Sequence, residues 1–444
     1  MMKKLFVLLL LLTLLLTSCA SSLEPEESHE TENTPKTEET ETESDIDPLE
    51  GVPGESVTVL SGKHNPDGFS VGFARYNISP EPGVGLAGFG TEDTRLSEKV
   101  LDELYVTCTA VSDGEETLLL FSVDSMKSSE SAWKLLSQKI EKELGIPQKN
   151  IIINATHSHS VPSISHSHHP TMRNYMQRFY AQALECAKTA VADLDKATVK
   201  IGRTYADNLN FVRRYIEVNG VTVHETEADN EMQIIYFERE NQKDVVLMNW
   251  QSHYCGGMAN TAVSADWVCG FRRNTETKLE VYSMFLQGAG GNLVCTGTLP
   301  GEYTPESYMT HGVRLSDTLL AAVPNLVTVE PGKIQAESKY FDATYKDKEG
   351  TEPLPISVLS FGPVSFATVS YEMIDTNGKE LKAATPFDMT FVCGYTNGAH
   401  AYIPSINCFE NGGYEVSKCY YVPGTGEAVV AELLTMLKVQ HDNL

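Results

Sequence analysis

The feature that most limits the fold of this chain is a regular alternation of short apolar strands with amphipathic helices. The spacing predicts strands at 104–111, 117–123, 151–154, 232–237, 245–249, 281–287, 356–361, 364–369 and 390–393. It predicts helices at 131–144, 174–194, 266–279, 307–322 and 426–439. Such alternation favours a layered α/β domain in which a mixed sheet is covered by helices.

The N-terminus resembles a bacterial lipoprotein signal. Lys3 and Lys4 precede an almost unbroken apolar run over 5–16, and Leu-Thr-Ser leads into Cys19. A basic start, a short apolar core and small residues before the cut are typical of a signal peptide. We therefore expect residues 1–19 to be a signal with a lipobox, Cys19 to carry the lipid, and the protein to be anchored outside the cytoplasm on the bacterial membrane. The alternative is an ordinary secretory signal with a chance cysteine.

An acidic, polar segment follows the signal. Residues 21–50 contain twelve Asp or Glu, one Lys and almost no apolar side chain. Such a composition cannot offset the entropy lost on ordering, so we expect 20–55 to be a disordered tether. The formal net charge of the whole chain is −26. This acidity argues against nucleic acid as a partner, and residues 56–444 are expected to form a single catalytic domain.

Chemically able residues fall at the ends of the predicted strands. They are Asp124, His157, His159, His253, Asn292, Glu372 and Tyr402. In α/β proteins ligands bind outside the carboxyl ends of strands, where loops present side chains without disturbing the sheet. This placement predicts one site built from segments that are distant in sequence.

Two histidines leave the apolar strand at 151–154 together. His157 and His159 stand at positions i and i+2, and a core face seldom accepts two imidazoles. They can act as two metal ligands, or as one ligand and one acid or base. The alternative is a polar surface loop, which the nearby histidines at 166, 168 and 169 would extend.

Several motifs together resemble the neutral/alkaline, non-lysosomal ceramidases. Thr156-His157-Ser158-His159 is similar to the Thr-His-Thr-His signature of that family. The other matching segments are 71–80, 86–90, 211–215, 249–253, 371–372, 397–404 and 413–415. The resemblance extends from about Val71 to about Glu415 and implies the fold of the N-terminal catalytic domain of these enzymes.

The resemblance implies one zinc ion per chain, held by four residues: His157, His253, Glu372 and Tyr402. Imidazole and carboxylate are ordinary zinc ligands, and a catalytic zinc keeps one position open for water. The implied activity is that of an amidohydrolase, in which zinc-bound hydroxide attacks an N-acyl amide. The substrate is expected to be ceramide-like, or another lipid or envelope N-acyl compound.

Three further residues are implied to be catalytic: His159, Tyr414 and Arg213. An imidazole with an ordinary pKa can accept and deliver the proton at His159. Tyr414 and Arg213 can donate hydrogen bonds to the developing oxyanion, and Arg214 is an alternative to Arg213. Asn292, directly after the glycine-rich loop at 288–291, is expected to contact the substrate.

The chain departs from the family pattern at the position of an active-site serine. Val294 stands there, and Cys295 and Thr296 come one and two residues later. The chain also ends soon after Tyr414, where full-length ceramidases continue into an immunoglobulin-like domain. Ceramide is therefore not the expected best substrate. The alternative function is a catalytically degenerate or solute-binding surface lipoprotein, and a structural adhesin would leave the polar residues at strand ends unexplained.

Overall fold

The computed structural model describes residues 68–89, 94–165, 170–219, 221–254, 261–296 and 305–444. The chain divides into two units, Met1–Asp47 and Pro48–Leu444, and every described residue belongs to the second. Cys19, the tether at 20–55 and the histidines at 166, 168 and 169 lie outside the described residues, so their interpretation remains a prediction.

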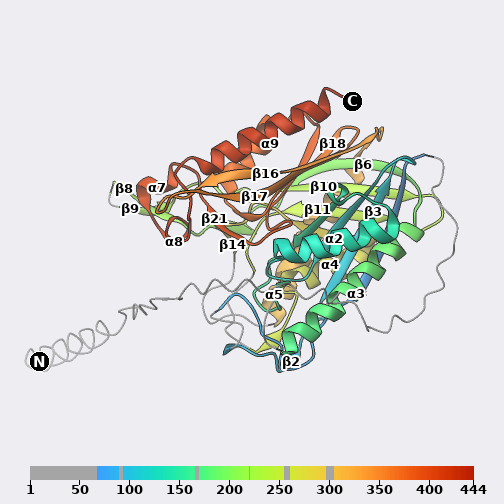
Figure 1. Cartoon of the computed structure of the whole chain (residues 1–444), viewed down its shortest axis with the longest axis horizontal. Coiled ribbons are helices and arrows are strands. Elements are labelled where there is room, and N and C mark those ends of the chain that lie inside the picture. The colour runs from blue at the N-terminus through green and yellow to red at the C-terminus, as the bar shows by residue number, and fades with distance from the viewer. Residues whose placement is uncertain (1–67, 90–93, 166–169, 220, 255–260, 297–304) are drawn as a thin grey trace, which may run out of the picture. The chain divides into compact units, whose positions relative to one another are not determined.

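In the described part of the chain, nine strands form a large mixed sheet (Figure 1). Its order is β13-β11-β10-β6-β1-β3-β4-β5, with β15 also paired to β6. The pairs β4–β5 and β11–β13 are parallel and the others are antiparallel. The strands are β1 (Ser70–Asn77), β3 (Tyr105–Ser112), β4 (Thr117–Val123), β5 (Ile151–Ala155), β6 (Asp195–Tyr205), β10 (Glu231–Arg239), β11 (Val245–Trp250), β13 (Tyr282–Gln287) and β15 (Val327–Val329).

A second sheet has the order β16-β17-β18-β20, in which β18 and β20 are parallel. Its strands are β16 (Ile334–Thr344), β17 (Thr351–Phe361), β18 (Val364–Val369) and β20 (Met389–Cys393). Short two-stranded pairings link β2 (Lys99–Val100) with β12 (Ala262–Val263), β7 (Asn210–Val212) with β14 (Leu293–Cys295), β8 (Tyr215–Val218) with β9 (Val221–His224), and β19 (Tyr371–Met373) with β21 (His400–Ile403).

The helices are α2 (Glu130–Leu144), α3 (Pro170–Ala192), α4 (Trp267–Leu279), α5 (Pro305–Ala322), α6 (Asp375–Ala384), α7 (Cys408–Asn411), α8 (Tyr414–Ser417) and α9 (Thr425–His441), with short 3-10 turns η2 (Gln148–Asn150) and η3 (Val323–Asn325). The sequence sets the ends of α2 directly. Ser129 accepts a hydrogen bond from the Ala132 amide at its start, and Gly145 closes it at φ 71°. Among the described helices, none is long and apolar enough to cross a bilayer.

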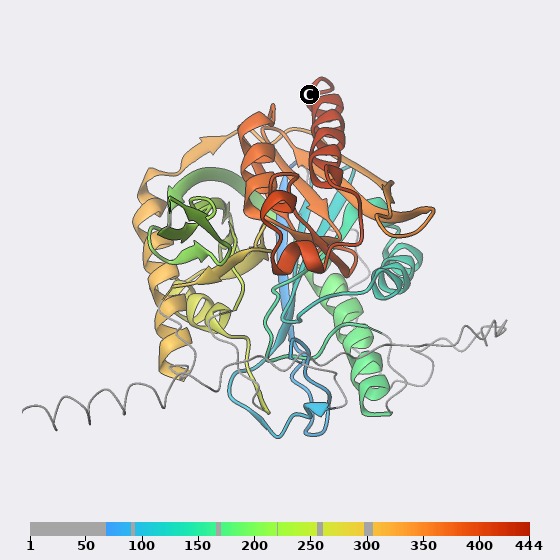
Figure 2. The same ribbon diagram turned by 90° about the vertical axis from the view of Figure 1, so that its left-hand side faces the viewer.

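The two sheets pack face to face and helices cover both outer faces. On β4, Leu118 and Leu120 belong to the core between the sheets, whereas Leu119 and Phe121 belong to the core beneath α2–α5. Residues of α6 and α9 pack on the other face of the smaller sheet. In Figures 1 and 2, the red helix α9 and the green helix α3 lie on opposite sides of the two sheets.

The order is therefore helices, sheet, sheet, helices. Successive strand side chains point to opposite faces, so strands buried on both sides are apolar throughout. The predicted layered α/β fold is confirmed.

Candidate metal centre

The candidate site lies where the carboxyl ends of strands from both sheets meet. The pairs β4–β5, β11–β13 and β18–β20 are parallel, so within each pair the loops that follow the two strands leave the same end of the sheet. The loops after β5, β11 and β13 and the short strand β19 after β18 carry the candidate residues. This is the convergence that the strand-end pattern predicts.

Asn154, the fourth residue of β5, ties these ends together. Its buried amide donates to the Gln287 carbonyl at 3.2 Å and the Gly394 carbonyl at 2.7 Å. Its oxygen accepts from the Gln287 amide at 2.7 Å. The Asn154 side chain therefore bonds the backbone at the end of β13 in the large sheet and just after β20 in the smaller one. These hydrogen bonds fix the distance between the two strand ends beneath the site.

His157 follows β5 with its backbone in the left-handed region, at φ 64°. This conformation is uncommon for a residue with a side chain and costs on the order of 1 kcal/mol or more. The His157 amide donates to the Ser125 carbonyl at 2.9 Å, and ring Nδ1 is 2.7 Å from the Met126 carbonyl. Since a carbonyl only accepts, Nδ1 carries the proton and Nε2 presents a lone pair to the site.

His253 follows β11 and is oriented in the same way. Its Nδ1 is 2.7 Å from the Gly290 carbonyl and 3.1 Å from the Leu293 carbonyl, so its Nε2 also presents a lone pair. Glycine at 291 lets the loop after β13 lie against β19, because a Cβ at Gly291 would be 2.9 Å from the Glu372 and Met373 carbonyl oxygens. The glycine-rich loop thus brings His253 and Glu372 together.

Glu372 on β19 completes a group of three acceptor atoms. Its Oε2 is 3.6 Å from His157 Nε2 and 3.4 Å from His253 Nε2. Neither nitrogen carries a proton toward the carboxylate, so three lone-pair donors face one another. Ligands at about 2.0–2.2 Å from a tetrahedral metal lie about 3.3–3.6 Å apart, and these separations agree. The arrangement fits a cation coordinated between them.

Two side chains compete to be the fourth ligand. Tyr402 on β21 places its hydroxyl 3.3 Å from His253 Nε2. His159 places its Nε2 3.2 Å from His157 Nε2, and the ligand atoms of His157, His159 and His253 all lie within 4.8 Å of one another. The structure therefore brings together every predicted metal ligand, and it places His159, the alternative second ligand of this loop, in the same group.

The buried imidazoles are neutral at neutral pH. Burial lowers the pKa of His157 to about 4 and that of His253 to about 3, and it also holds the pKa of His159 well below its ordinary value. The short contacts of His157 and His253 with Glu372 are thus contacts of neutral rings with a carboxylate, not ion pairs. Neutral imidazole is the form that binds a metal.

Arg213 and Arg214 separate into two roles. Arg213 donates to Glu415 at 2.7 Å and to the Tyr402 hydroxyl at 3.2 Å, so its guanidinium lies at the site. Arg214 is almost fully buried and pairs with Glu415 at 2.9 Å and with Glu225. Of the two, Arg213 is the one that reaches a candidate metal ligand, which favours the predicted assignment.

A cavity of about 520 Å³ opens beside the metal ligands. The ring of Tyr414, at the start of α8, is 5.5 Å from that of Tyr402 and half exposed. The Arg213 guanidinium lies over both rings, 5.6 Å from Tyr402 and 5.3 Å from Tyr414. The described residues that line the cavity include His159, Arg213, His253, Tyr402 and Tyr414.

Asn292 does not reach this cavity in the described structure. Its amide donates to Asp375 at 2.7 Å, and its oxygen accepts from the Asp375 amide at 2.9 Å. The Asn292 carbonyl also accepts from the Arg213 amide at 2.9 Å. This geometry corrects the expected substrate contact: Asn292 holds the start of α6 and the backbone of Arg213.

The thiol and hydroxyl after Val294 do not replace the missing serine. Val294 lies on β14 and pairs with Phe211 of β7. Cys295 directs its sulfur to the His253 carbonyl at 3.2 Å, and Thr296 donates to the Asn208 carbonyl. Both groups are already engaged with backbone carbonyls.

Four residues of the site had no sequence signal strong enough to single them out. Tyr395 packs its ring 4.0 Å from that of His157 and points its hydroxyl to Glu372 at 3.4 Å. Phe89 and Tyr254 line the cavity beside His159, and Glu415 anchors Arg213. The available hints were the position of Tyr254, directly after His253, and the presence of Phe89 and Glu415 in the family-like segments at 86–90 and 413–415.

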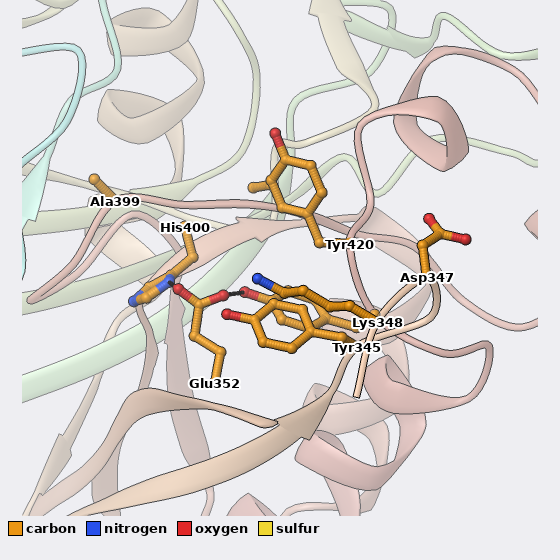
Figure 3. A pocket seen from close by; sticks show the side chains of 9 residues that line it. Tyr345, Asp347, Lys348, Glu352, Ala399, His400 and Tyr420 are labelled. Carbon is orange, nitrogen blue, oxygen red and sulfur yellow. Dashed lines mark hydrogen bonds and ion pairs between the residues drawn. The ribbon is translucent and has the colours of Figure 1, made fainter. Parts of the chain in front are cut away.

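A second cavity, of about 490 Å³, lies elsewhere (Figure 3). Its polar residues centre on Glu352. The Glu352 carboxylate accepts from the Tyr421 hydroxyl at 2.6 Å and lies 3.4 Å from His400 Nδ1. Lys348 covers the ring of Tyr345, with 3.8 Å between its nitrogen and the ring centroid. Asp347 also lines this cavity, but a single imidazole, that of His400, does not match the histidine set of the first cavity.

The fold and the site define a class: a two-sheet α/β protein with a buried histidine–carboxylate centre at its strand ends. No family model matches this chain, and no curated protein matches it. Among solved structures, the neutral ceramidase from Pseudomonas aeruginosa is similar, with a TM-score of 0.73 and 14% identity over 85% of this chain and 75% of that chain. A ceramidase complexed with C2 gives the same TM-score and identity over 85% and 76%. The predicted resemblance is thus confirmed for the fold, which this chain shares with neutral ceramidases.

Proposed function

We propose that this protein is a zinc-dependent hydrolase of N-acyl amides and a divergent member of the neutral ceramidase family. One observation carries the proposal. His157 and His253 direct their unprotonated nitrogens at one carboxylate oxygen of Glu372, within the fold of neutral ceramidases. Acceptor atoms crowded together in a buried site repel one another, and a cation between them removes that repulsion.

Zinc fits this donor set better than the hard cations do. Two imidazoles and one carboxylate suit zinc, whereas magnesium and calcium prefer ligands that are all oxygen. His157, His253 and Glu372 hold the ion, and Tyr402 is the proposed fourth ligand. When bound, the metal lowers the pKa of a coordinated water toward neutrality and polarises a carbonyl oxygen.

The remaining residues bind the substrate and move its protons. His159 takes the proton of the attacking water at Nε2, the atom that lies 3.2 Å from His157 Nε2, and returns it to the leaving amine. Arg213 is fixed by Glu415 and stabilises the developing oxyanion, together with the hydroxyl of Tyr414. Burial holds the pKa of Tyr414 above its ordinary value, so its phenol remains a proton donor at neutral pH.

The preferred substrate is an N-acyl amide other than ceramide. The cavity is lined by aromatic side chains from Phe89, Tyr215, Tyr254 and Tyr414, which suit an apolar acyl group. With Val294 at the family's serine position, a hydroxyl contact to the polar end of ceramide is absent. A site without that contact discriminates poorly for the group it would bind.

The test is metal analysis followed by a substrate screen. Purified protein should contain one zinc per chain, and the screen compares ceramide, other N-acyl amides, esters and peptides, with His157→Ala as the blank. Zinc-dependent cleavage of amides is the expected result. Turnover of esters alone would contradict the amidase assignment, and a zinc-loaded protein without turnover would support a binding lipoprotein instead.

We further propose that the enzyme acts at the bacterial cell surface, anchored by a lipid on Cys19. The basic start, the apolar run at 5–16 and the acidic segment at 21–50 support this proposal. Anchoring would raise the rate of encounter with lipid and envelope substrates.

A further inference from the structure

The three histidines of the centre are oriented in two different ways. His157 and His253 each direct Nδ1 to a backbone carbonyl, which fixes both ring and tautomer. His159 is different: its Nδ1 is buried and, among the described residues, has no hydrogen-bond partner. A catalytic imidazole is normally held by a second group on its far nitrogen. Something other than a hydrogen bond at Nδ1 must therefore hold this side of the His159 ring.

Aromatic rings and backbone enclose His159 instead. The Tyr254 ring lies against it, with centroids 4.0 Å apart and planes at 33°. Phe89 meets the imidazole edge-on at 5.4 Å and meets Tyr254 edge-on at 5.5 Å. On another side, a Cβ at Gly88 would be 2.4 Å from the ring of His159, so only glycine allows this approach.

We propose that Tyr254 is the positioning residue for His159, acting with Phe89 as an aromatic clamp that replaces the missing hydrogen bond. The clamp fixes where Nε2 points and leaves Nδ1 unengaged. The proposal rests on the proposed function of His159 as the proton-transfer group, because a misplaced imidazole would slow that transfer. Tyr254 is not proposed as a metal ligand or as a group that reacts.

The chemistry explains why packing suffices here. A stacked ring restricts rotation of the imidazole about its last torsion angle without accepting its proton. A carbonyl partner on Nδ1 would instead lock one tautomer, as it does in His157 and His253. Holding His159 by its faces keeps both nitrogens able to exchange a proton.

The test compares Tyr254→Leu, Tyr254→Phe and Phe89→Leu in the zinc-loaded full-length protein, with Tyr205→Leu as control. Tyr205 is an exposed tyrosine at the end of β6, outside the clamp. With an N-acyl aminocoumarin as probe, Tyr254→Leu should lower kcat by about 10- to 100-fold, since small misplacements of catalytic groups cost that much. Zinc content should change little, and Tyr254→Phe should retain most of kcat.

A spectroscopic measurement keeps the clamp testable apart from the amidase proposal. In protein with isotope-labelled histidine, the ring protons of His159 are assigned by their loss in His159→Ala. Removing the stacked ring in Tyr254→Leu should move them downfield, whereas Tyr205→Leu and Tyr254→Phe should not. Unchanged His159 resonances in Tyr254→Leu would overturn the clamp. If the wild type cleaves no amide, the amidase proposal fails and these resonances still decide the clamp.

Discussion

At the residue scale, two side chains are candidates for the fourth ligand of the proposed metal. Tyr402 and His159 lie at almost the same distance from a metal-facing histidine nitrogen, 3.3 Å and 3.2 Å. Burial and the charge of Glu372 raise the pKa of Tyr402 far above its ordinary value, and Arg213 opposes this rise through its contact with the phenol oxygen. A metal at this position would add a second, stronger positive charge beside that oxygen.

We expect Tyr402→Phe to weaken zinc binding by about tenfold or more, because one of four ligands is removed. His159→Ala should keep the zinc affinity within about threefold while kcat falls by about 100- to 10,000-fold, the usual contribution of general acid–base catalysis. Zinc titration with a competing chelator and steady-state kinetics measure the two effects separately. His157→Ala, which should lose metal and activity together, is the reference variant.

The reverse pattern would exchange the roles. If His159→Ala loses zinc and Tyr402→Phe keeps it, the centre is one of three histidines and a glutamate. Tyr402 would then contact the substrate beside Arg213, and the aromatic clamp on Tyr254 would orient a ligand instead of an acid or base.

The sequence predicted which residues come together better than it predicted the contacts that orient their side chains. His157, His253, Glu372, Tyr402 and Arg213 converge because each follows or lies on a strand that ends at the same place. Asn292 also follows a strand that ends there, yet its side chain is hydrogen-bonded to Asp375. These two residues are 83 positions apart in the sequence. Position after a strand therefore indicates which residues come near the site, but only packing decides which way a side chain turns.

At the element scale, the site depends on the ends of β5, β13 and β20 remaining aligned. Asn154 makes this alignment through hydrogen bonds to the backbone of Gln287 and to the Gly394 carbonyl, which also accepts from the Thr396 hydroxyl. Gln287, at the end of β13, extends the same network by donating to the Ser252 carbonyl at 2.6 Å.

Replacing Asn154 with Ala should lower the free energy of unfolding by about 3 kcal/mol, since several buried backbone groups lose their partner. The zinc affinity should fall as well, because the loops that carry His157 and His253 are no longer tied. Asn241→Ala is the matched control. Asn241 is exposed, bonds to Asp195, and should change stability by less than about 0.5 kcal/mol. Chemical denaturation decides; equal stability of the two variants would contradict the structural role of Asn154.

The strands that the sequence predicted are mostly buried on both faces, although β1, which is also largely buried, was missed. In β4 and β5 nearly every side chain is buried, and their apolar runs are plain in the sequence. The long strands β6 and β16 were missed because half-exposed positions alternate along them and carry Lys, Glu, Gln and Asp. Their strand conformation is imposed by neighbours: β6 by β1, β10 and β15, and β16 by β17.

At the scale of the whole molecule, the layered arrangement explains how one centre forms from distant segments. His157 and His253 come from the large sheet, while Glu372 follows β18 of the smaller one. A site at the common end of two packed sheets is assembled only when both are folded together. We infer that bound metal stabilises the packing of the two sheets against each other, in addition to the fold of each sheet.

The last prediction concerns anchoring. Cys19→Ala should move the protein from the membrane fraction to the soluble fraction, because the lipid has no acceptor. The segment at 21–50 is acidic and nearly free of apolar side chains, so it should neither pack on the enzyme nor influence the metal. Zinc content and kcat/KM should therefore stay within about twofold of the wild type, as expected for a flexible linker. Cell fractionation with detection of the protein, followed by metal analysis, measures both. Loss of zinc on release would show that the N-terminal segment supports the fold, and continued membrane association would show that the apolar run at 5–16 anchors the chain without lipid.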